Sequence, residues 1–184
     1  MNDPDLTYAQ VNLNDALEDV KLPKKFSCGD AILDKYVNSG NLKRAIQSEN
    51  LHATGMFDDT KELIGFMTVG FGILDKTRVK TFLKGNQPPQ LPVAKVIMIA
   101  VDERHQGLGL GTDLMLEAFT KAVTVHKTIP LKGVYLDAAP GKETFYSEMF
   151  GFTALEGPGP AGSTPMYIPI ENVIAALLEA DNLE

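Results

Sequence analysis

The chain has 184 residues, of which 44% are hydrophobic and 22% charged, the proportions of an ordinary globule with enough length to bury a core. It has no apolar run of the ~18 residues that suggest a membrane span, no secretory signal at its start, and one cysteine, Cys28, which excludes an internal disulfide and a cysteine-rich zinc site. The formal net charge of −7 is concentrated at the ends, because residues 1–19 and 171–184 together hold nine acids and no base. We therefore expect a cytoplasmic protein with solvated acidic ends, no membrane contact and no metal site.

Two helices and a hairpin are predicted in the first half of the chain. Ser27 or Asp30 can cap the first helix, over residues 31–38, whose apolar residues share one face. The other predicted elements are a helix over residues 41–48 and strands over residues 51–57 and 62–74, which pair across residues 58–61. Glycines in the second strand indicate a bulge or a close approach of another backbone.

A cationic loop separates this half from the next. Residues 75–91 read as a loop and hold Lys76, Arg78, Lys80 and Lys84. These four cations either form a basic lip for an anionic partner or are simply solvated. Together with Lys43 and Arg44 they are the candidates for a surface that binds nucleic acid.

The second half alternates strands and helices. The predicted order is a strand over 93–101, a helix opening near residue 112, a strand over 133–138, a helix over 142–149, short strands over 152–155 and 166–170, and a closing helix over 171–178. This order predicts an α/β (α+β) fold with a mixed central sheet of about six to seven strands flanked by helices.

The sharpest chemical signal is the glycine-rich turn between the strand 93–101 and the long helix. Glycines at 107, 109 and 111 remove the side chains that would keep a ligand away from the backbone. Several N–H groups can then converge on one anion, assisted by the positive end of the helix dipole near Thr112. A pyrophosphate fits this arrangement.

Two nucleotide motifs do not fit the turn. A dinucleotide site needs the spacing G-x-G-x-x-G, whereas the chain has G-x-G-x-G and no acid about 20 residues further on. A P-loop needs a lysine after the last glycine, and Thr112 stands there. A purely structural turn between strand and helix remains an alternative.

Two motifs together resemble the GCN5-related N-acetyltransferases. The family pattern Q/R-x-x-G-x-G/A matches Gln106-Gly107-Leu108-Gly109-Leu110-Gly111, and an aromatic-Tyr pair on a short helix ending in Gly-aromatic matches Phe145-Tyr146 and Gly151-Phe152. The resemblance implies a single acetyl-CoA-binding domain over residues 26–170. The acidic extension over 1–25 and the acidic helix over 171–184 lie outside it and have no counterpart in the resemblance. It also implies acetyl-CoA as cosubstrate, bound by Ile99, Ala100, Val101 and the run from Gln106 to Thr112.

A closer resemblance is to the toxin acetyltransferases of type II toxin–antitoxin modules. That branch opens with F-x-C-G before a helix carrying L-D-x-[YW], as do Phe26–Gly29 and Leu33–Tyr36 here. It also has a proline-rich approach to the fourth strand, matched by residues 88–93. The resemblance implies aminoacyl-tRNA as an acceptor and an antitoxin protein as a partner, with a homodimer as a further candidate assembly.

The resemblance also assigns a mechanism. The amine attacks the thioester, and Tyr146 is the general acid for the leaving thiolate; alternatively, Tyr146 only packs among aromatic rings. Glu103 and His105 are the nearest candidate bases. Without a dedicated base the acceptor is expected to be an α-amine, because such an amine is already partly neutral near pH 8. A non-catalytic coenzyme-binding regulator stays open as a second alternative.

Overall fold

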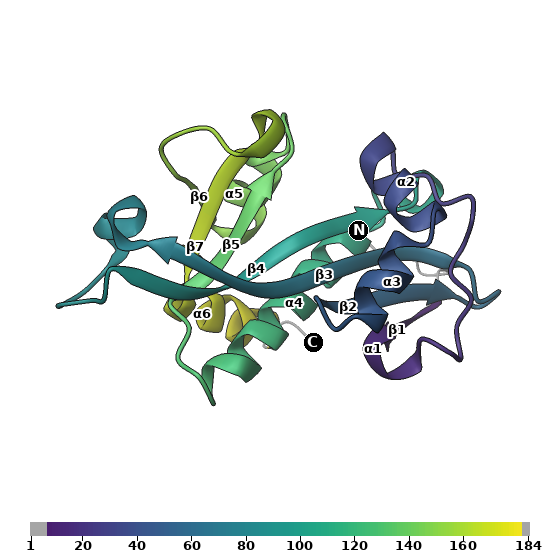
Figure 1. Cartoon of the computed structure of the whole chain (residues 1–184), viewed down its shortest axis with the longest axis horizontal. Coiled ribbons are helices and arrows are strands. Elements are labelled where there is room, and N and C mark those ends of the chain that lie inside the picture. Colours follow the sequence, from purple (N-terminus) through teal and green to yellow (C-terminus); the bar gives the residue numbers. More distant parts are fainter. Residues whose placement is uncertain (1–6, 182–184) are drawn as a thin grey trace. The chain divides into compact units, whose positions relative to one another are not determined.

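The computed structural model describes residues 7–181, which form two compact units. The first unit comprises the described residues up to Gly70 together with Met98–Met115, and the second comprises Phe71–Ile97 together with the residues from Leu116 onward. Seven strands form a mixed sheet in the order β1-β2-β3-β4-β5-β7-β6 (Figure 1). The α/β class and the strand number predicted from the sequence are confirmed.

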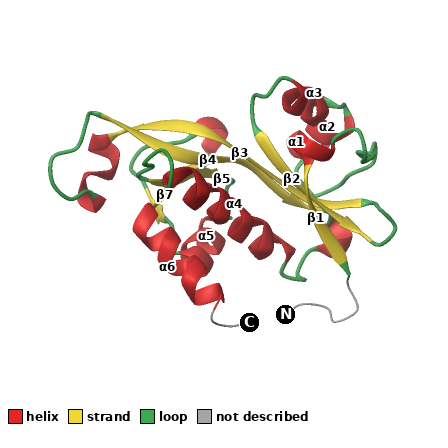
Figure 2. Ribbon diagram, turned by 90° about the horizontal axis from the view of Figure 1, so that it is seen from below, coloured by secondary structure: helices red, strands yellow, loops and turns green. Residues whose placement is uncertain are grey.

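The first unit contains an antiparallel part of the sheet and three short helices. Its elements are β1 (Tyr8–Asn12), α1 (Leu13–Ala16), α2 (Ala31–Asn38), α3 (Asn41–Gln47), β2 (His52–Asp58), the first part of β3 (Leu63–Asp75) and the end of β4 (Gln90–Val101). The three helices lie on one face of β1 and β2 (Figure 2). They bury an apolar core in which Leu13, Leu42 and Phe66 have no exposed surface, because each helix presents its apolar side to the strands.

The predicted helices and hairpin of this unit are confirmed. Asp30, and not Ser27, caps α2, because the Asp30 carboxylate accepts hydrogen bonds from the N–H groups of Ile32 and Leu33. The prediction contained no element before residue 31, whereas β1 pairs with β2 and α1 follows it directly. The first six residues of the predicted acidic extension and the last three of the chain lie outside the described residues.

The second unit contains the rest of the sheet. Its elements are η1 (Lys76–Phe82), β5 (Gly133–Ala138), α5 (Glu143–Phe150), β6 (Thr153–Ala154), η3 (Pro160–Gly162), β7 (Thr164–Pro169) and α6 (Ile170–Asp181), with the outer parts of β3, β4 and α4 (Leu110–His126). β4 runs parallel to β5, which pairs antiparallel with β7, and α6 packs on β5 and β7 (Figure 2).

The predicted loop over residues 75–91 is wrong in two respects. Residues 76–82 form the 3-10 helix η1, and β4 begins at Gln90 and not at Val93. The physical reason is burial at two points: Val79 has no exposed surface, and the ring of Phe82 packs 5.6 Å from that of Tyr167. Within the described part of the chain, no helix is long and apolar enough to cross a membrane.

Candidate functional site

The glycine turn presents free backbone donors at the start of α4. Gly107 and Gly109 have φ angles of 79° and 87°, which favour glycine because a side chain would strain the backbone there. The Gly109 carbonyl begins the helix by accepting hydrogen bonds from the N–H groups of Thr112 and Asp113. Within residues 7–181, the N–H groups of Gly107, Leu108 and Gly109 have no hydrogen-bond acceptor. Three donors at a helix N-terminus therefore remain available to an anion.

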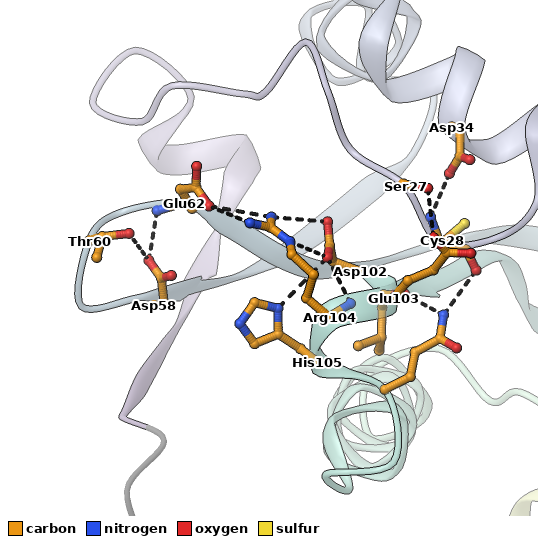
Figure 3. A network of polar contacts seen from close by, with 12 residues as sticks. Ser27, Cys28, Asp34, Asp58, Thr60, Glu62, Asp102, Glu103, Arg104 and His105 are labelled. Atoms are coloured by element: carbon orange, nitrogen blue, oxygen red, sulfur yellow. Dashed lines mark hydrogen bonds and ion pairs between the residues drawn. The ribbon is translucent and has the colours of Figure 1, made fainter.

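Three hydrogen bonds join the turn and the η2 residues before it, Glu103–His105, to the chain segment before α2. The side-chain amide of Gln106 donates to the carbonyl oxygens of Cys28 and Val101, both at 2.9 Å. The Glu103 N–H donates to the Ser27 carbonyl at 2.8 Å, and the Ser27 hydroxyl donates to the Glu103 carboxylate (Figure 3). Gln106, predicted to bind the coenzyme, thus uses its side chain to hold the turn in place.

The surroundings of Cys28 keep its thiol from acting as a nucleophile. Burial raises the pKa of its thiol to about 12, so the thiol stays protonated at neutral pH. Among the described residues, no group of three or more His, Cys, Asp or Glu side chains is placed to hold a metal ion.

A buried carboxylate fixes the short 3-10 helix η2 (Glu103–His105) that precedes the turn. Asp102 is buried, and its carboxylate accepts hydrogen bonds from the backbone N–H of Arg104 at 3.1 Å and from its Nε at 2.8 Å (Figure 3). Burial alone would raise the pKa of Asp102, but these bonds to Arg104 outweigh it and hold that pKa below the ordinary value. The Nδ1 atom of His105 lies 3.9 Å from the same carboxylate, so this candidate base faces an acid.

The end of β4 lies close to β3 inside the first unit. A side chain on Gly65 would come within 3.2 Å of the Ala100 carbonyl oxygen, which confirms the close backbone approach predicted from the glycines of this strand. The Met98 N–H donates to the buried hydroxyl of Thr68 at 3.1 Å. The predicted binding of acetyl-CoA by Ile99, Ala100 and Val101 stays a prediction, and one lone pair of the Val101 carbonyl is already used by Gln106.

Tyr146 belongs to the second unit, on α5. The helix ends at Gly151, whose φ of 76° allows its N–H to reach the Ser147 carbonyl, while the Phe152 N–H reaches that of Tyr146. The Tyr146 ring packs against those of Phe145 and Phe152, with centroids 5.2 and 6.0 Å away. Burial raises its pKa to about 12, and its hydroxyl has no hydrogen-bond partner within the described chain. The phenol is therefore held protonated and unpaired.

Most of the cations singled out from the sequence already form a hydrogen bond or an ion pair within the protein. Lys76 and Arg78 donate to backbone carbonyls, Arg44 donates to Asn41, and Lys43 lies 3.9 Å from a carboxylate oxygen of Glu18. A different cationic set was missed. Lys21, Lys24, Lys25 and Lys61 line a pocket of about 780 Å³ in the first unit. The run K-L-P-K-K could have indicated three of them, but only the fold brings Lys61 to the same place.

Comparisons with known proteins agree with this geometry. A model of the Acetyltransferase (GNAT) family matches residues 28–152. The tRNA-acetylating toxin of Mycobacterium tuberculosis (strain ATCC 25618 / H37Rv) is 26% identical over 129 residues, which are 69% of this chain and 75% of that protein.

Two solved structures have the same fold. The crystal structure of a bacterial toxin is 32% identical, with a TM-score of 0.86 over 94% of this chain and 96% of its own. A mutant of the AtaT toxin, bound to the C-terminus of the antitoxin AtaR and to acetyl-CoA, is 20% identical, with a TM-score of 0.71 over 93% and 97% of the two chains. With its glycine turn and the family match over two thirds of its length, the chain belongs to the GNAT family and is an acetyl-CoA-dependent N-acetyltransferase.

Proposed function

We propose that the enzyme acetylates the α-amino group of an aminoacyl-tRNA, with the glycine turn holding the pyrophosphate of acetyl-CoA and Tyr146 protonating the leaving thiolate. The observation that carries the chemistry is Tyr146, whose side chain is largely buried and protonated and whose hydroxyl has no partner within the described residues. A proton donor must start protonated, and a phenol without a partner inside the protein is free to bond a ligand.

The kind of amine that the enzyme can use depends on whether a side chain near the turn is free to act as a general base. Of the two candidate bases, the Glu103 carboxylate accepts a hydrogen bond from Ser27, and the Nδ1 atom of His105 faces the Asp102 carboxylate at 3.9 Å. Both are engaged with neighbouring side chains, so an amine that is already partly neutral near pH 8 is the better substrate. The α-amine of an aminoacyl ester is of this kind, and the M. tuberculosis relative is a tRNA-acetylating toxin. By the same comparison we propose that the chain works in the cytoplasm as the toxin of a module, with an antitoxin protein as its partner.

Acetyl transfer from radiolabelled acetyl-CoA to total charged tRNA, compared with a panel of small amines and peptides, tests the acceptor. We expect label on charged tRNA that is released when the ester bond is hydrolysed. Label on small amines alone would contradict the proposal.

The role of Tyr146 is tested with Tyr146→Phe. We expect kcat to fall by roughly 10²-fold or more, with the Kd for acetyl-CoA nearly unchanged, because only the proton is removed. Tyr36→Phe is the matched control, since the Tyr36 hydroxyl forms no hydrogen bond within the described residues. An equal loss of turnover and of coenzyme binding would contradict the acid role and favour a packing role.

A further inference from the structure

We infer that the pocket lined by Lys21, Lys24, Lys25 and Lys61, here called the lysine pocket, binds phosphate groups of the RNA backbone of the substrate. This inference rests on the proposed function, because it assigns the surface that an RNA substrate would contact. No part of it depends on the cations of residues 76–84.

The lysine pocket is a concentration of unpaired positive charge in an acidic protein. The chain has a formal net charge of −7, so a phosphate backbone would be repelled by much of its surface. The four lysines are exposed and form no ion pair or hydrogen bond through their side chains within residues 7–181. The two carboxylates that line the pocket, Glu62 and Asp102, are both contacted by the guanidinium of Arg104.

Both walls of the pocket are fixed by hydrogen bonds. On one side, Phe26 directly follows Lys25, and its backbone N–H and carbonyl are both bonded at 2.8 Å by the side chain of Asn38. On the other side, the Asp58 carboxylate accepts hydrogen bonds from the Thr60 hydroxyl and the Glu62 N–H, which shapes the turn carrying Lys61 (Figure 3). The lysines therefore extend from a preorganised frame, which lowers the entropic cost of binding an extended polyanion.

Lys61 occupies a backbone position that does not suit it. Its φ is 64°, in the left-handed region where glycine or asparagine is less strained. A lysine at such a turn is more readily explained by a use for its charge than by the stability of the hairpin. An RNA backbone is favoured over an acidic peptide because the proposed acceptor is itself attached to RNA.

The test is the triple variant Lys24→Ser, Lys25→Ser, Lys61→Gly, in which the last change also relieves the strained turn. Binding of fluorescently labelled uncharged tRNA is measured by anisotropy over a range of salt concentrations. We expect the Kd to rise at least tenfold, and the slope of log Kd against log salt to fall by up to about three, if each lysine contacts one phosphate. Lys24→Arg with Lys25→Arg should retain wild-type binding, as should the control Lys35→Gln on the exposed side of α2.

The inference and the proposed function fail in different ways. Failure of wild-type enzyme to acetylate charged tRNA would overturn the proposed function, whereas the anisotropy experiment decides the pocket independently of turnover. A triple variant that binds tRNA with wild-type affinity and salt dependence would overturn the inference. Polyglutamate binding that is lost in the triple variant, with tRNA affinity unchanged, would overturn it in favour of an acidic peptide. An unchanged KM for acetyl-CoA in the triple variant, with a raised KM for charged tRNA, would support it.

Discussion

The side-chain amide of Gln106 donates a hydrogen bond of 2.9 Å to the carbonyl oxygen of Cys28, a residue 78 positions earlier in the chain. The contact joins the F-x-C-G step before α2, on which the resemblance to the toxin branch depends, to the glycine motif before α4, on which the family resemblance depends. It also explains why a glutamine suits this position: one NH₂ group supplies two donors, and both find carbonyl oxygens.

Gln106→Leu should therefore weaken acetyl-CoA binding, because the turn loses the two hydrogen bonds that hold its shape. The change keeps a similar size but removes both hydrogen bonds, each worth about 1 kcal/mol. We expect the Kd for acetyl-CoA, measured by calorimetry, to rise by up to about tenfold, since 1.4 kcal/mol corresponds to a factor of ten. Gln87→Leu is the matched control, because it removes one side-chain hydrogen bond to the Lys84 carbonyl in an exposed loop. Unchanged coenzyme affinity in Gln106→Leu would contradict the positioning role.

A comparison of Gly107→Ala with Gly85→Ala should distinguish the cost of a strained backbone from the loss of contact with acetyl-CoA. Gly107 and Gly85 both have positive φ, and an added Cβ would meet no atom within 4 Å at either position. Each substitution to alanine should cost about 1–2 kcal/mol of stability from the left-handed backbone alone. Only Gly107→Ala should also weaken acetyl-CoA binding, because only there does the methyl group stand beside free N–H donors. Equal coenzyme affinity in the two variants would show that the turn does not hold the pyrophosphate.

The parts of the site that could be predicted from the sequence are those determined locally. The glycine spacing at 107–111 and the aromatic helix ending at Gly151 depend on nearby residues, and both lie where they were expected. The cap by Asp30 is equally local, but the sequence allows Ser27 as well, and only the hydrogen bonds to Ile32 and Leu33 identify Asp30 as the cap.

What could not be predicted depends on contacts between distant parts of the chain. β1 is a five-residue segment, Y-A-Q-V-N, that becomes a strand by pairing with β2 more than 40 positions later. The hydrogen bond from Gln106 to Cys28 is long-range in the same sense, as is the meeting of Lys61 with the lysines before Phe26. Periodicity and spacing carry no signal for such pairings.

Gly133→Ala should destabilise the second unit by steric overlap. A Cβ on Gly133 would lie 2.2 Å from the Ile168 carbonyl oxygen and 2.5 Å from the Tyr167 ring, so β5 and β7 would have to separate. We expect a loss of about 3 kcal/mol or more in denaturant unfolding. Gly141→Ala is the control, since it adds a methyl group in open space and costs only the strain of a φ of 81°. A loss at Gly133 no larger than that at Gly141 would contradict the close β5–β7 packing.

Asp102→Asn should remove the part of the acid-range pH dependence of the unfolding free energy that comes from residue 102. The pKa of Asp102 in the folded protein is below its ordinary value, so its ionised form adds stability above pH ~4, and this contribution is lost as the pH falls toward the folded pKa. At pH 7 the variant should be less stable by about 1.5–3 kcal/mol, the range for a hydrogen bond to a charged group. As the pH falls from about 4 through the folded pKa of Asp102, the two unfolding free energies should converge, because wild-type Asp102 then becomes protonated in the folded protein as well. Asp59→Asn, at an exposed hairpin position, is the control and should leave the unfolding free energy at pH 7 close to that of wild type. A constant difference between Asp102→Asn and wild type across this range would mean that Asp102 acts by shape and not by charge.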